Sequence, residues 1–372
     1  MKKHSDIHVR LLKLILWVYI ALCFVIAGLN YGYVSKAPEH IAHAITWIWL
    51  IYENWVKTLF IIVGSFLTIR IIGSSKRSIM RKRNLIGFTM AALLLHILVP
   101  FLTNNFELYF YTMPFPWTTT PLRLLDQSTS FYQSNFAAWG AGGIMAALIV
   151  YVCICVVVLV ATLLFGRRFQ CSTVCLFNGF AAEVFDPAMP LIGKRRQLKP
   201  ETVRALYILR WIFLGLALLL FLYWGLHLFG VSLPIDKEAV AKAESYKYLA
   251  GELLAAIFFW IAFMGRGYCT YCPLGTVLGF VAKIADQRIT TAHTSCIACN
   301  KCNAICPMFI NIKTNAIKGA DVKDIRCVGC GHCVDECPTR NLAYSTKFLS
   351  VINREIPVHK QREGDNAALP PD

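Results

Sequence analysis

The chain has 372 residues, of which 57% are hydrophobic and 16% are charged. Its positive mean hydropathy, +0.54, is too high for an ordinary soluble protein of this length and predicts a membrane-embedded chain. The formal net charge of +16 would suit a nucleic-acid binder, but the basic loops lack the interleaved aromatic residues of nucleic-acid surfaces. We therefore expect no nucleic-acid partner.

Six apolar stretches are long enough to cross the hydrocarbon core of a bilayer, which takes about 20 residues of helix. The first is long and lacks a small-residue cleavage site, so we expect a retained span and not a signal peptide. The predicted spans are residues 11–29, 47–72, 85–103, 137–165, 205–230 and 248–264.

The distribution of positive charge predicts how the chain is oriented. Of the 37 Lys and Arg residues, 30 lie in residues 1–13, 70–84, 166–204 and 265–372. By the positive-inside rule these segments face the cytoplasm. We therefore predict a multi-pass protein of the bacterial cytoplasmic (inner) membrane with both termini in the cytoplasm. The long aromatic loop 104–136 is then expected at the outer interface.

The composition changes after the last span and predicts a second, soluble domain. We expect an α-helical membrane domain of six transmembrane helices and a small C-terminal α+β domain. The predicted boundaries are 1–264 for the membrane domain, 265–285 for a juxtamembrane cysteine motif and linker, 286–350 for the soluble domain and 351–372 for a flexible tail.

Eight cysteines in the C-terminal region form a CxxCxxCxxxCP run that repeats 31 residues later. In such runs three closely spaced thiolates bind one 4Fe-4S cluster, and the cysteine before the proline reaches the other cluster. The predicted ligand sets are Cys296, Cys299, Cys302 and Cys337 for one cluster, and Cys327, Cys330, Cys333 and Cys306 for the other. Disulfides are disfavoured by a reducing cytoplasm. Structural zinc is disfavoured because zinc sites normally use four ligands and lack the repeated third and fourth cysteines. We therefore expect residues 286–350 to form a domain of the bacterial 2[4Fe-4S] ferredoxin type.

The segment between the two runs, INIKTNAIKGADVKDIR, alternates apolar and polar residues over short stretches. This alternation predicts strands that pair in a small ferredoxin sandwich.

Two further cysteine pairs follow the fourth and sixth predicted spans, each after a Gly-Arg sequence. Both spans run inward, so we expect the pairs to meet at the cytoplasmic face. They have two interpretations: small apolar side chains that pack at helix ends, or ligands of a metal site, a third cluster or a redox-active thiol site beside basic residues. The cysteines are Cys171, Cys175, Cys269 and Cys272.

Ionisable residues inside predicted spans are candidates for function. His96 and His227 lie on different helices and are candidates for contacting a quinone or holding a haem. Satisfied interfacial histidines are the alternative. Glu53 and Lys57 are one helical turn apart, which predicts an ion pair.

The juxtamembrane sequences GRRFQCSTVC and GRGYCTYCPLG, followed by the eight-cysteine segment, resemble the membrane-bound 4Fe-4S polyferredoxin family of the NapH, NosR and CcoG type. That family's juxtamembrane motif is CxxxCP, twice. Here Leu176 replaces the first proline and the second pair is one residue shorter. The resemblance covers residues 140–345.

The resemblance implies an electron-transfer subunit of the quinol dehydrogenase type, which passes electrons between quinol in the membrane, the cytoplasmic clusters and a respiratory partner. The expected partners are the lipid bilayer, the quinone pool and redox proteins of a larger respiratory complex. The alternative is an accessory factor that supplies electrons for copper reduction or for maturation of a respiratory enzyme.

Overall fold

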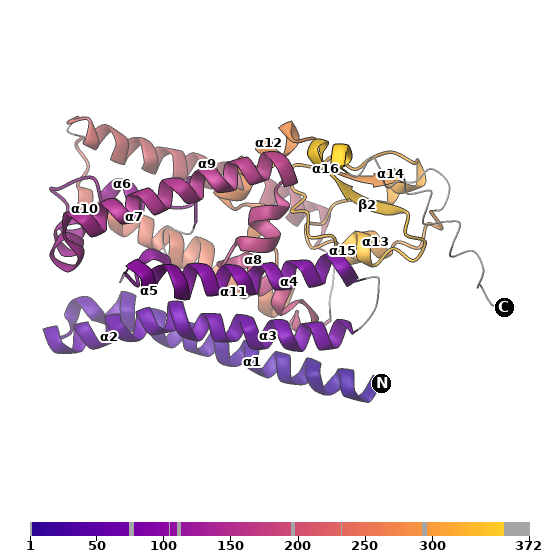
Figure 1. Cartoon of the computed structure of the whole chain (residues 1–372), viewed down its shortest axis with the longest axis horizontal. Coiled ribbons are helices and arrows are strands. Elements are labelled where there is room, and N and C mark those ends of the chain that lie inside the picture. Colours follow the sequence, from indigo (N-terminus) through magenta and orange to yellow (C-terminus); the bar gives the residue numbers. More distant parts are fainter. Residues whose placement is uncertain are drawn as a thin grey trace.

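The computed structural model describes residues 2–73, 78–103, 105–109, 113–194, 198–231, 233–291 and 296–352, with only the backbone of residues 2–5, 35 and 130. A bundle of long helices occupies one part of the molecule, and a small domain with two strands lies at one end of it (Figure 1). The predicted tail begins inside α16, and residues 353–372 of it lie outside the described residues.

Five helical stretches are long and apolar enough to cross a membrane: Asp6–Tyr33, Glu39–Ile72, Ile79–Thr103, Phe131–Phe165 and Pro200–Leu228. They correspond to the first five predicted spans and confirm a mainly helical membrane domain. Their helices are α1 (Lys2–Gly28), α2 (Glu39–Ile51), α3 (Lys57–Ile72), α4 (Ile79–Ala92), α5 (Val99–Thr103), α7 (Ser130–Phe165) and α9 (Pro200–Leu228). The short α6 (Thr120–Arg123) lies in the loop before α7.

The sixth predicted span is not among these five. It falls in a continuous helical run made of α10 (Lys237–Tyr246), a π-helical segment Lys247–Leu254 and α11 (Ala255–Ala262). Its first half is polar, and Lys247 and Glu252 lie within it, which lowers its hydropathy. The run nevertheless returns the chain toward the C-terminal domain, and the N-terminus lies at that same end of the bundle (Figure 1).

The segment after α7 folds back between the helices instead of lying on the surface. All seven residues of α8 (Asn178–Val184) are buried. Glycines on α3 and α4 make room for this segment: a Cβ added at Gly64 would lie 2.5 Å from Val184 Cγ1, and one at Gly87 would lie 2.2 Å from Thr173 Cγ2. Thr68 Oγ1 also donates a 2.5 Å hydrogen bond to the Val184 carbonyl.

The C-terminal domain follows α12 (Pro273–Ile284). Strand β1 (Arg288–Thr291) pairs antiparallel with β2 (Leu342–Ser345), with Ile289 opposite Tyr344. The predicted strands between the cysteine runs are wrong. Most of that segment is helix or loop, and only Val322 makes an isolated bridge, to Ile289.

A side-chain cap explains this difference. Asn303 Oδ1 accepts hydrogen bonds from the backbone N–H groups of Ile312 and Lys313, at 2.8 and 2.9 Å, where α14 (Lys313–Ile317) begins. Such a cap satisfies donors that a helix start leaves unpaired. The domain's other helices are α13 (Lys301–Ile305), α15 (His332–Asp335) and α16 (Lys347–Ile352).

Candidate metal centres

Four cysteines of the C-terminal domain surround one cavity near its surface. Three come from the first cysteine run and one from the end of the second: Cys296, Cys299, Cys302 and Cys337. Cys299 is exposed, and the other three are partly exposed. The structure thus brings together the first ligand set predicted from the sequence.

The second predicted set surrounds a separate cavity, deeper in the molecule: Cys306, Cys327, Cys330 and Cys333. This set faces the membrane domain. Asn84 Nδ2 of α4 donates a 2.9 Å hydrogen bond to the Cys330 carbonyl, and Ser172 Oγ donates a 2.8 Å bond to the carbonyl of Val328. The cysteine before each proline therefore lies with the opposite run, which is the exchange expected of a two-cluster ferredoxin.

The two juxtamembrane pairs meet inside the helix bundle. Arg167 Nε donates a 3.2 Å hydrogen bond to Cys171 Sγ, and Nη2 of the same guanidinium donates one of 3.2 Å to the Cys269 carbonyl. Asn178 Nδ2 lies 3.2 Å from Cys269 Sγ, and a Cβ added at the adjacent Gly179 would lie 2.8 Å from Cys175 Cβ. The structure thus brings together the two pairs that the sequence predicted to meet, and it encloses them among the helices.

Enclosure changes the chemistry of these thiols. Burial raises the pKa of Cys175 to about 11, and the neighbouring Cys269 and Cys171 thiols add to the rise. Burial also raises the pKa of Cys272. A bound metal deprotonates a coordinating thiol outright. The second cationic side chain at the site, Arg266, has a buried Nε without a hydrogen-bond partner among the described residues. The surroundings therefore fit an anionic, metal-bound centre.

The spacing of the thiols distinguishes between kinds of centre. Four thiolates around one zinc ion lie about 3.8 Å apart, because each Zn–S bond is about 2.3 Å in a tetrahedron. Within the described part of the chain, one group alone has three ligand atoms within 4.8 Å of one another: Glu183, Cys330 and His332. None of the three predicted cysteine sets has three ligand atoms that close to one another among the described residues. A wider spread suits a cubane, in which each sulfur binds a different iron.

Glu183 joins the enclosed cysteines to the C-terminal domain. Arg266 Nη2 donates a 2.6 Å hydrogen bond to Glu183 Oε1, and its Nη1 donates a 2.8 Å bond to the Cys171 carbonyl. Glu183 Oε2 lies 3.0 Å from Nε2 of His332, which stands between Cys330 and Cys333 in the sequence. Burial favours the neutral acid, but His332 and Arg266 outweigh it and lower the pKa of Glu183 to about 2. An ionised bridge therefore spans the two sites.

The two candidate histidines lie in different surroundings. His96 is buried in the π-helical segment Leu93–Leu98 and faces a small cavity with Glu53 and Lys57. His227 contacts the ring of Tyr223 on its own helix, with centroids 4.7 Å apart. The predicted ion pair is confirmed, because Lys57 Nζ lies 2.7 Å from Glu53 Oε2.

Sequence reasoning missed Glu183, Asn178 and Gly179. The one available signal was an acidic residue in the apolar stretch LFNGFAAEVF, since an acid in such a segment usually has a buried partner. It also missed the contact of the aromatic loop 104–136 with the second cysteine motif. Trp117 Nε1 donates a 3.1 Å hydrogen bond to the Tyr268 hydroxyl, next to Cys269.

Comparisons with known proteins agree with this geometry. Residues 295–342 match the family of 4Fe-4S dicluster domains, so the C-terminal region is a ferredoxin-type iron–sulfur domain. Over 188 residues the chain is 28% identical to the putative electron transport protein YccM of Escherichia coli (strain K12), which covers 48% of this chain. The match spans about half, 51%, of that relative. No solved structure matches the chain.

These matches support an iron–sulfur electron-transfer protein with transmembrane helices and do not reach the NapH or NosR subfamily.

Proposed function

We propose that this protein passes electrons between a hydroquinone in the membrane and a soluble redox partner. The eight cysteines of the ferredoxin domain would hold two 4Fe-4S clusters, and the enclosed cysteines would hold a third. Bound clusters supply one-electron chemistry. The observation that carries the proposal is the position of the enclosed set: Cys171, Cys175, Cys269 and Cys272 lie within the bundle and connect to the ferredoxin domain through Arg266, Glu183 and His332.

The three cysteine sets would act in a fixed order. The enclosed set lies among the membrane helices. The set with Cys330 lies next to it, joined by Glu183 and by Ser172, which bonds to the ferredoxin domain at Val328. The set with the exposed Cys299 is the one closest to solvent. A soluble partner would therefore exchange electrons at that outermost set.

The surface around Cys299 supports an acidic partner. The exposed Ile297 and Ile317 provide apolar contact area. Three lysines beside these isoleucines form no ion pair within the described residues: Lys301, Lys313 and Lys318. Other basic residues of the same domain pair with aspartates, namely Arg288, Lys323 and Arg326. Unpaired charges of one sign attract a protein of the opposite sign and raise its association rate.

Charge and architecture support the proposed membrane placement. The positive-inside pattern supports the cytoplasmic membrane, with the ferredoxin domain in the cytoplasm. The position of the N-terminus at the same end as that domain supports both termini on one side (Figure 1). The NapH, NosR and CcoG resemblance at the enclosed cysteine motifs supports a quinol as the membrane donor and a respiratory complex as the setting.

The test uses the holoprotein purified without oxygen and inserted in lipid nanodiscs. The clusters are reduced with dithionite, excess reductant is removed, and a short-chain benzoquinone is added while the visible absorption of the clusters is followed. We expect fast reoxidation in the wild type and slow reoxidation in Cys171→Ala/Cys269→Ala, with both ferredoxin clusters retained in the variant. Equal rates in the two proteins would remove the enclosed set from the route.

A further inference from the structure

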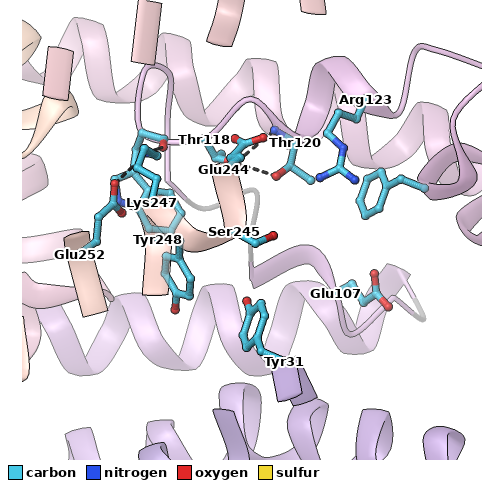
Figure 2. Close-up of a pocket in the computed structure, with 12 residues that line it drawn as sticks. Tyr31, Glu107, Thr118, Thr120, Arg123, Glu244, Ser245, Lys247, Tyr248 and Glu252 are labelled. Atoms are coloured by element: carbon cyan, nitrogen blue, oxygen red, sulfur yellow. Dashed lines mark hydrogen bonds and ion pairs between the residues drawn. The ribbon is translucent and has the colours of Figure 1, made fainter. Parts of the chain in front are cut away.

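A cavity of about 710 Å³, including its open mouth, lies at the end of the bundle away from the ferredoxin domain (Figure 2). It is formed by the end of the first span, the loop before α7, and the helical run that begins with α10. Its lining includes Tyr31, Trp117, Arg123, Glu244, Lys247 and Glu252.

Glu244 presents an unused acceptor to this cavity. Its Oε1 accepts hydrogen bonds from the Thr119 backbone N–H at 3.1 Å and from the Thr119 hydroxyl at 2.6 Å, which fix the carboxylate. Its Oε2 is buried and has no hydrogen-bond partner among the described residues. A buried carboxylate oxygen without a partner is costly. A ligand hydroxyl would satisfy it.

A donor and a second acid lie farther along the same helical run. Lys247 Nζ donates a 2.8 Å hydrogen bond to Glu252 Oε1 and lies 3.5 Å from the Trp117 carbonyl. Glu252 is almost fully buried, at 1% exposure. An ammonium group of this kind can also donate to a ligand carbonyl. The cavity thus offers an acceptor for a hydroxyl group and a donor for a carbonyl group.

Aromatic side chains complete the site. Trp117 and Tyr248 meet edge to face, with ring centroids 6.0 Å apart, and Phe131 lies under the Arg123 guanidinium. Flat aromatic ligands pack well against such rings. We infer that this cavity binds the headgroup of a membrane hydroquinone and of the corresponding quinone, with Glu244 as acceptor for the reduced form and Lys247 as donor to the oxidised form.

The site is also connected to the enclosed cysteines. Trp117 lines the cavity and donates a 3.1 Å hydrogen bond to the hydroxyl of Tyr268, which is adjacent to Cys269 in the sequence. One tyrosine therefore separates the cavity from the enclosed set. The inference rests on the proposed function for its ligand class, and it adds the location and the residues that recognise the ligand.

Binding can be measured without electron transfer. The holoprotein in detergent is titrated by calorimetry with a non-oxidisable hydroxyquinoline N-oxide analogue and with a decyl-benzoquinone. Glu244→Gln keeps the bonds to Thr119 but presents an amide to the cavity, and we expect it to weaken analogue binding about ten- to hundredfold, the usual worth of a charged hydrogen bond. The matched control is Glu238→Gln, an exposed acid on the same helix, which should leave the Kd unchanged.

A second variant, Ser245→Trp, fills the cavity from its lining and should abolish binding. The absorption spectrum of the clusters verifies that each variant is folded. Unchanged Kd values in both variants would overturn this location while leaving the proposed function intact. If the wild type bound neither compound, the inference would be overturned as well. The electron-transfer proposal would then be tested separately, by measuring the iron bound at the enclosed cysteines.

Discussion

Arg266 and Glu183 form a buried ion pair, with 2.6 Å between Nη2 and Oε1 and each side chain 1% exposed. The same carboxylate contacts His332 of the ferredoxin domain on its other side. Removing one partner from a buried pair leaves an uncompensated charge. Glu183 therefore holds the second juxtamembrane motif and the ferredoxin domain in one arrangement.

Neutralising this carboxylate should destabilise the protein. Glu183→Gln keeps the size of the side chain but leaves Arg266 without its counter-charge, and we expect a loss of about 3–5 kcal/mol in the free energy of unfolding. Fluorescence-monitored unfolding of the holoprotein in detergent measures this. The exposed Glu201→Gln should change it by less than about 0.5 kcal/mol. Similar losses in the two variants would contradict the role of Glu183.

A methyl group at Gly179 should disrupt the enclosed centre alone. A Cβ there would lie 2.8 Å from both the Cys171 carbonyl oxygen and Cys175 Cβ, so Cys175 must move. We expect Gly179→Ala to lose about four irons per chain, the content of one cubane, and to keep both ferredoxin clusters. Gly215→Ala on α9 is the control, since its Cβ would meet nothing within 4 Å. Full iron content in Gly179→Ala would count against a cluster at this site.

The exchange of the fourth ligands predicts opposite effects for two similar cysteines. Cys306 lies with the deep set and Cys337 with the set near solvent. A relaxing agent dissolved in water broadens the paramagnetic signal of the cluster near solvent and leaves the signal of the deep cluster sharp. We expect Cys306→Ser to alter the sharp signal and Cys337→Ser to alter the broadened one. The reverse assignment would show that each run binds its own fourth cysteine.

The lysines near Cys299 should govern the rate of encounter with an acidic partner. Lys301→Glu/Lys318→Glu should slow electron exchange with an acidic flavodoxin by about tenfold at low salt, and the difference should vanish at high salt. Lys242→Glu, an exposed lysine on α10, should have no effect. Stopped-flow rates across a salt series measure this, and a salt-independent rate in the wild type would exclude the lysine surface.

The parts of the structure that depend on local spacing could be predicted from the sequence. The eight cysteines specify two ligand sets because each run places three thiols within seven residues, and Glu53 and Lys57 pair because they are one turn apart. Enclosure of the juxtamembrane pairs could not be predicted. The enclosure depends on the space left by Gly64 and Gly87, which lie on helices far from Cys171 in the sequence. Val184 and Thr173 fill that space.

The alternation of apolar and polar residues also gave a wrong prediction where a side chain from another helix caps the segment. The pattern at Lys313–Ile317 predicts part of a strand, but Asn303 caps this segment as a helix. The sixth predicted span is not among the apolar helices because Lys247 and Glu252 lower the hydropathy of the helical run. The two side chains pair with each other, and this pairing is a property of the fold and not of composition.

A count of iron and acid-labile sulfide in the anaerobically purified chain tests the central claim most directly. Three cubanes, one of them held by Cys171, Cys175, Cys269 and Cys272, give about twelve irons and twelve sulfides per chain. Cys269→Ala/Cys272→Ala should reduce both to about eight, the content of the two ferredoxin clusters. About eight irons in the wild type, unchanged in that variant, would contradict a cluster at the enclosed cysteines.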